Sequence, residues 1–438
     1  APTPPPPALS HPQPPHPQPP KPACRLPLEG VRVLDLTMVW AGPFATKFLA
    51  DMGAEVLKVE SLNHIDSRLW AGFAYKDATA ENIPYARDNY VVLFSRNKLG
   101  ITLDLGTEIG RNLFLQLVAI SDVVIENFAA GVLDRLGLDF ETLRGVNPRI
   151  ILAGMPGFGN DGPERDFVAY GTTLEALSGL AGITGYAADE PHKSGINYGD
   201  PVAGMHAAGA VMAALHRMRR TGHGELIEVA QLESLIMLLG ETVVDYSMNG
   251  CSTTTHGNAD PLMAPQGVYP CRGADRWLAL TLANDEEWEK LVDLLGRPVW
   301  ASGPELATAA GRRRQTALID AHLANWTRDQ DQMELMKRLQ AAGLRAGAVL
   351  DAAQVLADPH LTARGLFVEV DHPDGRSLPL AFNPWRCNGR REPVRRRAPA
   401  LGEDNDYVFH DLLGLNRSQI DELERRRISG RLPILGEA

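Results

Sequence analysis

The sequence predicts an α/β fold, with a Rossmann-like parallel sheet in a large domain and a smaller α+β domain after it. Two observations lead to this prediction. Short apolar segments alternate with helical segments between residues 31 and 154, as the crossover connections of a parallel sheet require. After about residue 250 the pattern changes to alternating strands followed by helices. The chain of 438 residues is long enough for two domains with large cores.

The first strand–helix–strand unit occupies residues 31–60. Residues 31–36 are an apolar strand candidate, and 41–43 form a turn whose proline is placed to open a helix over 44–52. Gly53 suits the C-terminal cap of that helix, and 54–60 is the next strand. A helix between two strands predicts parallel pairing with a right-handed crossover.

The same alternation continues through the next hundred residues. The remaining expected elements are a strand over 100–105, a helix over 107–120, a strand over 122–126, a short helix over 133–136 and a strand over 149–154. A glycine-rich loop over 157–163 and a long helical region from 172 into the 200s follow. These elements predict one sheet of parallel strands that extends past residue 150.

The remainder of the chain predicts a smaller domain and a return to the large one. Strands are expected over 267–271 and 277–282, helices over 286–295 and 314–339, a hairpin over 365–382 with its turn at 373–375, and helices in the last 40 residues. The expected divisions are a disordered proline-rich tail (1–26), the large domain (27–245), the small domain (246–345), and a last segment (346–438) that returns to the large domain and ends in helices. The tail is predicted because residues 1–22 contain twelve prolines.

Composition excludes several classes of function. The net charge of −11 argues against nucleic acid as a partner. The four cysteines form no CxxC pair, so neither a zinc site nor a disulfide framework is expected, and a reducing cytoplasm fits best. We also expect no membrane association, because no apolar run approaches the length of a membrane span and the N-terminus lacks the apolar core of a signal peptide.

Asp200 is the main candidate for a chemical role. It lies in the run GDPVAG at 199–204, before a small-residue helix expected over 202–215. Aspartate is a favoured N-cap and proline a favoured first helical residue, so the run predicts a helix start without any chemistry. A helix N-terminus also stabilises a carboxylate as an anion, and a nucleophile must be ionised. Both roles remain open on these residues alone.

An ordered set of short runs carries a resemblance over residues from about 27 to 410. The runs are VLDL (33–36) with AGP (41–43), GAEVLKVE (53–60), RNK (96–98), ENF (126–128) with LDRLG (133–137), GFG (157–159), GD (199–200), APQGVY (264–269) and LGE (401–403). The set resembles the class III CoA-transferases, the family that includes formyl-CoA:oxalate and carnitine CoA-transferases. The resemblance implies a CoA-binding large domain, an interlocked homodimer and a nucleophilic aspartate at Asp200, with coenzyme A as substrate and no metal.

The resemblance also implies a set of binding residues. Those assigned to CoA are Val39, Trp40, Ala41, Lys98, Leu103, Asn127, Phe128 and Arg135. Leu103 matches an adenine contact and Arg135 a phosphate contact, while Trp40 and Tyr170 are assigned to the substrate acid. The alternatives are a surface ion pair for Arg135, a turn-forming role for Asn127, and core packing for Trp40 and Tyr170.

The chain departs from the family pattern at four positions. Ser61 and Gly106 stand where some members carry basic residues, so phosphate binding would depend on Arg135, Lys98 or Arg96. Trp40 replaces a glutamine of the oxalate-using members, and Gly171 replaces a carboxylate. These two changes predict an acceptor larger and less polar than oxalate.

The expected reaction moves CoA from a short acyl-CoA, such as succinyl-CoA, to an organic acid through a covalent aspartyl intermediate. One alternative is a weakly catalytic or non-catalytic subunit that works with a paralogous chain, as in benzylsuccinate CoA-transferase. Another is an acyl-CoA racemase, whose histidine would align with Tyr170. An ordinary phenol keeps its proton at neutral pH and is a poor base, which disfavours the racemase.

Overall fold

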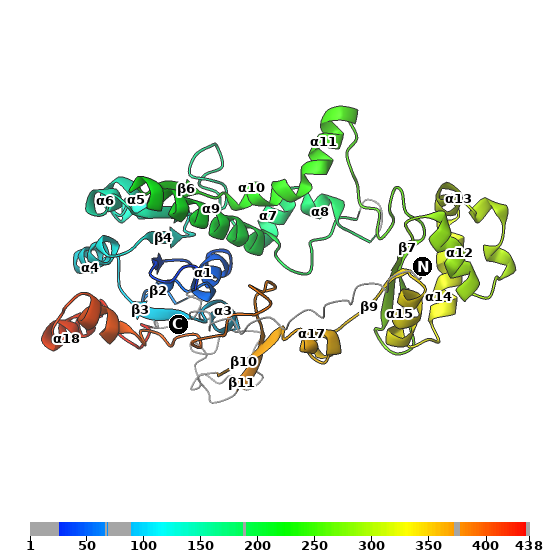
Figure 1. Cartoon of the computed structure of the whole chain (residues 1–438). Coiled ribbons are helices and arrows are strands. Elements are labelled where there is room, and N and C mark those ends of the chain that lie inside the picture. The colour runs from blue at the N-terminus through cyan, green and yellow to red at the C-terminus, as the bar shows by residue number, and fades with distance from the viewer. Residues whose placement is uncertain (1–25, 66–67, 69–88, 187–189, 372–376, 435–438) are drawn as a thin grey trace, which may run out of the picture.

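The computed structural model describes residues 26–65, 68, 89–186, 190–371 and 377–434. The proline-rich tail expected over 1–22 and the hairpin turn expected at 373–375 lie outside these ranges. The described chain forms a larger and a smaller body, which two segments connect (Figure 1). Within the described ranges, none of the helices combines the length and the apolar character that a membrane crossing requires.

The larger body is built on a six-stranded parallel sheet, which confirms the predicted α/β class. Its strands are β1 (Arg32–Asp35), β2 (Glu55–Glu60), β3 (Lys98–Thr102), β4 (Val123–Glu126), β5 (Ile151–Gly154) and β6 (Leu226–Glu228). They lie in the order β3-β2-β1-β4-β5-β6, and every neighbouring pair is parallel. The order reverses between β1 and β4, and ligands of such sheets bind at this position, beyond the carboxyl ends of the strands.

Helices cover both faces of this sheet. The helices α1 (Ala41–Asp51) and α9 (Gly199–Thr221) pack on one face, and α4 (Glu108–Ala119), α6 (Phe140–Val146) and α18 (Arg417–Arg425) on the other. Side chains alternate along a strand, so Val33 joins the first core and Leu34 the second. Both faces are therefore buried, which explains the nearly continuous apolar character of the strands.

Shorter elements complete the larger body. They are α3 (Asn89–Phe94), α5 (Val132–Arg135), α7 (Gly171–Leu177), α8 (Leu180–Ile183), α10 (Gln231–Ile236), η2 (Met237–Leu239), α11 (Gly240–Asn249) and η5 (Tyr407–Leu412). The helix α11 projects away from the sheet (Figure 1).

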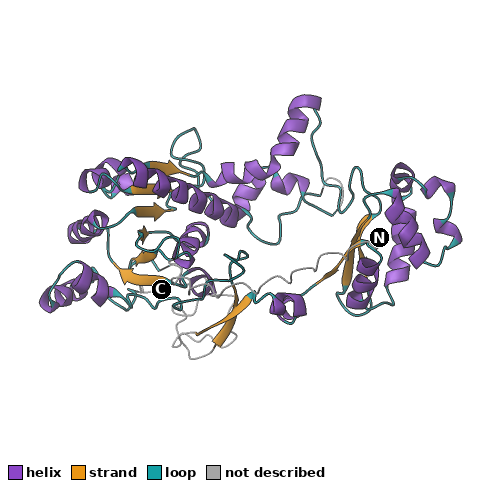
Figure 2. Ribbon diagram, viewed as in Figure 1, coloured by secondary structure: helices purple, strands orange, loops and turns teal. Residues whose placement is uncertain are grey.

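The smaller body packs helices against one face of an antiparallel sheet (Figure 2). Its strands are β7 (Gln266–Pro270), β8 (Trp277–Thr281) and β9 (Arg345–Val349). Its helices are α12 (Asp285–Leu294), η3 (Val299–Ala301), η4 (Pro304–Leu306), α13 (Ala309–Arg314), α14 (Thr316–Thr327) and α15 (Gln332–Ala341). Trp288, Leu280 and Leu323 lie in their common core, which is separate from the two cores of the larger body.

The chain then returns to the larger body. It passes through α16 (Ala352–Leu356), α17 (Pro359–Ala363) and the hairpin β10 (Phe367–Asp371) and β11 (Ser377–Ala381). The Arg96 guanidinium donates to the Ala381 carbonyl at 3.1 Å, and the Asn383 amide donates to the Asp51 carboxylate at 2.9 Å. These contacts fix the returning segment against α1 and the end of α3.

Several sequence expectations differ from the structure. The helix α9 starts at Gly199 with Tyr198 as its N-cap, so Asp200 lies in the first turn and does not cap the helix. The helical region expected from residue 172 is interrupted, because Gly179 adopts a left-handed conformation at φ 92° and ends α7. The strand β6 was not predicted, since its three residues are too few to show a period.

Candidate active site

A cavity of about 410 Å³ lies beyond the carboxyl ends of the central strands. Its lining comes from the segments that follow β1 and β3 and from the second half of β2 with the residues after it. Phe128 after β4 and two residues at α5, Val132 and Leu136, complete the lining. Leu103 and Phe128, two of the predicted CoA contacts, are part of this lining, and Leu103 is fully buried. The position matches the ligand crevice of an open parallel sheet.

Two basic side chains of the cavity lining were not among the predicted site residues. Lys58 is buried and its ammonium donates to the Thr37 carbonyl at 3.1 Å, while His64 is exposed at the rim. Ser61 and Gly106, where family members carry cations, are also in the lining. The signal that could have identified Lys58 is a lysine between apolar residues in the middle of a buried strand.

The loop after β1 connects this cavity to Asp200. Met38 lines the cavity, and Val39, Trp40 and Ala41 follow it into the first residues of α1. Val39 has a φ of 62°, a left-handed conformation that is a genuine outlier for a β-branched residue. The Trp40 ring stacks on Phe94, with centroids 5.9 Å apart and an interplanar angle of 19°.

Asn127 also contacts this loop. Its side-chain oxygen accepts from the Met38 N–H at 2.7 Å, and its side-chain nitrogen donates to the Met38 carbonyl at 2.9 Å. The amide thus joins the segments after β1 and β4, on the two sides of the position where the strand order reverses. Its expected contact with CoA stays a prediction.

Asp200 lies in the first turn of α9 and is partly buried. Burial raises the pKa of Asp200 to about 6; the nearby Ala41 backbone N–H works against this rise, and the neighbouring charge of Glu175 adds to it. Asp200 is therefore mostly ionised at neutral pH and carries a more basic carboxylate than an ordinary aspartate.

Glu175 supports the segment that leads into α9. The carboxylate is fully buried and accepts hydrogen bonds from the Ser194 hydroxyl at 2.7 Å, the Ser194 N–H at 3.1 Å and the Tyr198 N–H at 2.8 Å. It thus fixes the chain two residues before Asp200. The sequence analysis missed Glu175 because nothing in its local pattern shows that α7 packs against the start of α9.

Two glycines permit close approaches around Asp200. A Cβ on Gly171 would lie 2.5 Å from the Asp200 Oδ2 atom and would overlap the Asn197 side chain. A Cβ on Gly204 would lie 2.6 Å from the Ala41 carbonyl oxygen. The first glycine brings α7 to the carboxylate, and the second brings α9 against the start of α1.

Lys98 is enclosed by protein groups in this structure, and its predicted contact with CoA stays a prediction. Its ammonium is fully buried and donates to the Asp35 carboxylate at 2.9 Å and the Thr46 hydroxyl at 2.7 Å. Arg96 is likewise fully buried and paired with Asp51 at 2.9 Å. Lys98 at the start of β3 and Arg96 just before this strand both bind α1, because a buried charge requires a partner inside the fold.

The two remaining predicted residues lie on the surface. Arg135 is exposed at the end of α5, the short helix whose Val132 lines the cavity. Tyr170 is 56% exposed at the start of α7, so it is not a core residue. Within the described ranges, no three His, Cys, Asp or Glu side chains are grouped as metal ligands would be.

The chain was compared with known families, sequences and structures. A profile of CoA-transferase family III matches residues 28–405. The succinyl-CoA--D-citramalate CoA-transferase of Chloroflexus aurantiacus is 34% identical over 92% of this chain and 98% of its own. The succinate--glutarate CoA-transferase of Agrobacterium fabrum is 33% identical over 90% and 97%. The crystal structure of a CAIB/BAIF family protein from Brucella suis matches with a TM-score of 0.80 and 33% identity, over 89% of this chain and 100% of that one.

Proposed function

The chain belongs to CoA-transferase family III, and from this we propose that it moves CoA from succinyl-CoA, or another short acyl-CoA, to a medium-sized organic acid through a covalent intermediate on Asp200. One observation carries the proposal: a single short loop runs from the cavity to the surroundings of Asp200. Met38 lines the cavity, and three residues later the Ala41 N–H lies near enough to Asp200 to lower its pKa. The Ala41 carbonyl oxygen packs against the same helix as Asp200, 2.6 Å from where a Cβ on Gly204 would stand. A thioester whose nucleotide end occupied the cavity could then follow this loop to the carboxylate.

The chemistry needs few groups besides the carboxylate. Asp200 attacks the thioester carbonyl, and the CoA thiolate leaves to give a mixed anhydride. The thiolate attacks the aspartyl carbonyl, which releases the donor acid and leaves an aspartyl-CoA thioester. The acceptor carboxylate then expels the thiolate to form a second anhydride, and the thiolate attacks the acceptor carbonyl to give the new acyl-CoA and free Asp200. Carboxylate and thiolate are adequate nucleophiles and leaving groups, so one difficult transfer becomes several easier ones.

The surroundings of Asp200 suit this role. Partial burial removes water that would hydrolyse an anhydride, and it also makes the carboxylate more basic, with a pKa of about 6. The Ala41 N–H orients the carboxylate and is a candidate donor to an oxyanion that develops there. Leu103 and Phe128 are proposed to contact the adenine, with Arg135 contributing to phosphate binding from the rim.

The substrate proposal rests on the relatives and on two positions of this chain. The two relatives described above are named for succinyl or succinate as one partner, with D-citramalate or glutarate as the other. Gly171 has no side chain beside Asp200, and the Trp40 ring lies at the start of α1. We therefore propose an acceptor in the size range of these acids, with some apolar character.

The test is to trap the enzyme during turnover. The protein is incubated with succinyl-CoA and a candidate acceptor, treated with hydroxylamine or borohydride, and the modified acid is located by mass spectrometry. We expect the label on Asp200, and we expect Asp200→Ala to abolish transfer while still binding CoA. Asp161→Ala, at an exposed acid in the loop 157–163, is the matched control and should retain labelling and turnover. A label at another acid, or near-normal turnover by Asp200→Ala, would overturn the mechanism.

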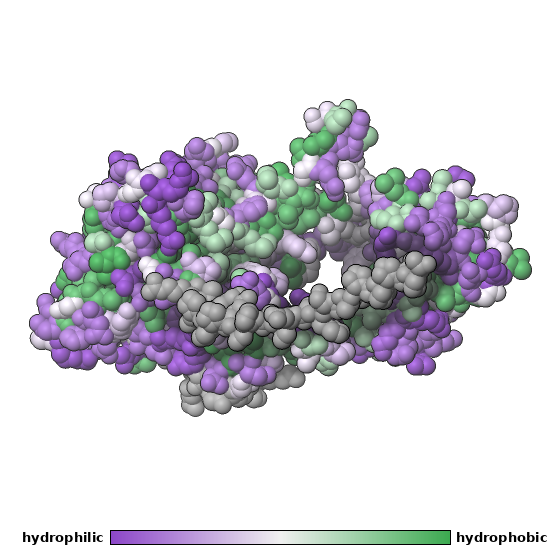
Figure 3. All heavy atoms as spheres, in the orientation of Figure 1, coloured by the Kyte–Doolittle hydropathy of each residue, from purple (hydrophilic) through white to green (hydrophobic). Residues whose placement is uncertain are grey.

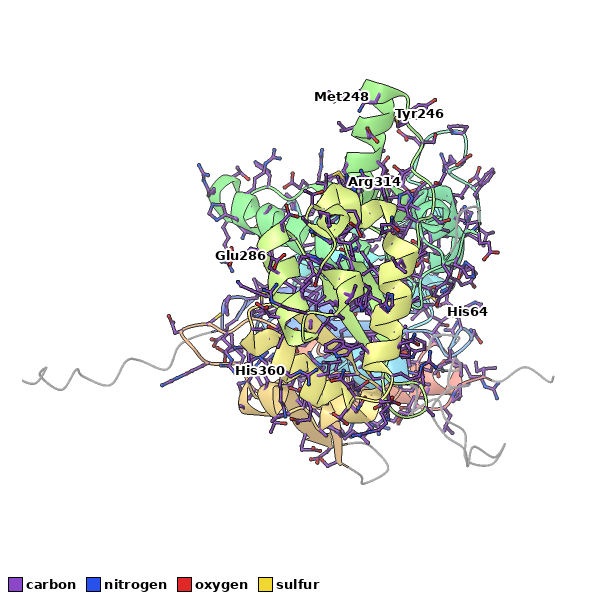
Figure 4. All side chains as sticks on the ribbon, turned by 90° about the vertical axis from the view of Figure 1, so that its right-hand side faces the viewer. His64, Tyr246, Met248, Glu286, Arg314 and His360 are labelled. Carbon is purple, nitrogen blue, oxygen red and sulfur yellow. The ribbon has the colours of Figure 1, made fainter. Side chains whose placement is uncertain are left out.

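We further propose that two copies interlock as a homodimer. The space-filling view shows an opening through the molecule between the two bodies (Figure 3), through which a second chain could pass. The projecting helix α11 carries exposed Val243, Val244, Tyr246 and Met248, and Figure 4 shows the last two at its outer end. Apolar surface of this kind commonly lies in a subunit interface.

Subunit exchange distinguishes the possible assemblies. Two differently tagged samples of an interlocked dimer should exchange subunits only after unfolding. In a folded chain, the two bodies and the two segments that connect them form a closed ring around the opening. If the purified chain is inactive with every donor but gains activity when a paralogous chain is added, a heteromer replaces the homodimer.

We also propose a location in the reducing cytoplasm. The described cysteines, Cys251, Cys271 and Cys387, are free thiols, as is usual in that compartment.

A further inference from the structure

The loop after β1 holds a conformation that needs external support. Val39 has a φ of 62°, and a branched Cβ makes this left-handed region unfavourable. Such conformations persist only where surrounding contacts determine them, and they gather at functional sites. Glycine would adopt the same conformation without the steric cost. The contacts that hold Val39 in place are therefore informative about function.

Asn127 provides a contact of this kind. Both ends of its amide bind the backbone of Met38, the residue immediately before Val39, at 2.7 and 2.9 Å. This pair of hydrogen bonds fixes the peptide groups on both sides of the Met38 Cα. The contact joins two loops that are 89 residues apart in the sequence.

The geometry of this loop controls the surroundings of Asp200. Two residues beyond Val39, the Ala41 N–H lies near the Asp200 carboxylate and lowers its pKa. The Ala41 carbonyl oxygen packs against α9 at Gly204, where a Cβ would lie 2.6 Å away. A change of φ at Val39 would redirect this short segment, because only Trp40 separates it from Ala41.

We propose that Asn127 is a positioning residue: its amide holds the left-handed turn at Val39 and thereby keeps the Ala41 N–H aimed at Asp200. The inference rests on the proposed function, since it assigns a role in the acylation of Asp200. The sequence analysis gave Asn127 a contact with CoA, with a turn-forming role as the alternative, and the proposed role develops that alternative.

The test compares Asn127→Ala and the isosteric Asn127→Asp, which loses the donor to the Met38 carbonyl, in two backgrounds. One background is the native sequence and the other carries Val39→Gly. The measurements are the single-turnover rate of Asp200 acylation by succinyl-CoA and the Kd for CoA. Asn147→Ala is the matched control, because the Asn147 amide also binds two backbone carbonyls, those of Val118 and Ser121, at a distance from the site.

We expect Asn127→Ala and Asn127→Asp to slow acylation roughly tenfold to a hundredfold, as small misplacements in active sites do. The Kd for CoA should change much less than the rate. With Val39→Gly as the parent, the additional loss from Asn127→Ala should shrink to less than about threefold, because glycine adopts the left-handed conformation without the steric cost that the Asn127 hydrogen bonds offset in valine. Asn147→Ala should leave the acylation rate at its native value.

The opposite results identify which idea fails. A CoA Kd that rises as much as the rate falls, with no recovery in the Val39→Gly background, would make Asn127 a ligand contact. Native acylation rates in both Asn127 variants would also overturn the positioning role. If the native chain is never labelled at Asp200 during turnover, the proposed function itself fails. Circular dichroism identifies a variant that has not folded, and Asn127→Asp then carries the comparison.

Discussion

The pH dependence of acylation offers a sharp prediction about Asp200. Its carboxyl is partly buried, and this burial raises its pKa from 3.8 to about 6. The proposed nucleophile is the ionised form of Asp200, and a raised pKa means that this form is lost as the pH falls through about 6. The rate of the first chemical step should therefore decline well before an ordinary aspartate would protonate.

The expected size of the effect follows from the ionised fraction. At pH 5, one unit below the pKa of Asp200, about one tenth of the enzyme carries the ionised carboxylate, whereas an aspartate with a pKa of 3.8 would be more than about nine-tenths ionised. Between pH 8 and pH 5 we therefore expect acylation to slow roughly tenfold, with a midpoint near 6.

The assay is the single-turnover release of CoA from a short acyl-CoA, measured across this range. Replacing Glu175 by Gln removes a negative charge that raises the pKa of Asp200, so the midpoint should move to lower pH. Glu233→Gln, at an exposed acid of α10, is the control and should leave the midpoint in place. A native profile that stays flat down to pH 5, or a midpoint that rises in Glu175→Gln, would refute this account.

Three further substitutions test the assignment of cations and close contacts. Lys98→Ala removes the ammonium that lies 2.9 Å from the buried Asp35 carboxylate. We expect it to lower the free energy of unfolding by about 3–5 kcal/mol in urea titrations. Native stability combined with weakened CoA binding would instead support the ligand role of Lys98. Gly204→Ala introduces a Cβ 2.6 Å from the Ala41 carbonyl, and the resulting separation of α1 and α9 should cost about 1–3 kcal/mol and slow acylation; native values for both would contradict the close approach. Arg135→Ala should raise the Kd for CoA by roughly tenfold or more in calorimetry, through loss of a charge-assisted contact, and an unchanged Kd would remove Arg135 from the site.

Much of the larger body could be predicted from short stretches of sequence. The strand candidates at 31–36, 54–60 and 122–126 overlap β1, β2 and β4, and the intervening helices predicted their parallel pairing. The ordered family runs predicted membership of the CoA-transferase family, which the family profile confirms. Such features are local: a strand shows its period in a few residues, and a helix carries its start and stop signals at its ends.

Contacts between distant segments could not be predicted in this way. Lys98 was expected at a ligand, but its strand directs the ammonium inward to Asp35, 63 residues away. Tyr198 occupies the N-cap position of α9 and its N–H donates to the distant Glu175, while Asp200, the residue that the local pattern favours as a cap, lies inside the first turn.

The sequence by itself determined the alternating α/β pattern and the family, because both are written in the identity and spacing of short runs of residues. The choice of Asp200 as nucleophile followed from the family resemblance and stays a prediction. Only the tertiary structure decided that Gly171 brings α7 to Asp200, that Glu175 anchors the chain before it, and that Asn127 holds the loop beside it. These contacts depend on how helices and loops from separate parts of the chain pack at the carboxyl end of the sheet. Their geometry is set by packing and hydrogen bonding across the fold, which no local pattern encodes.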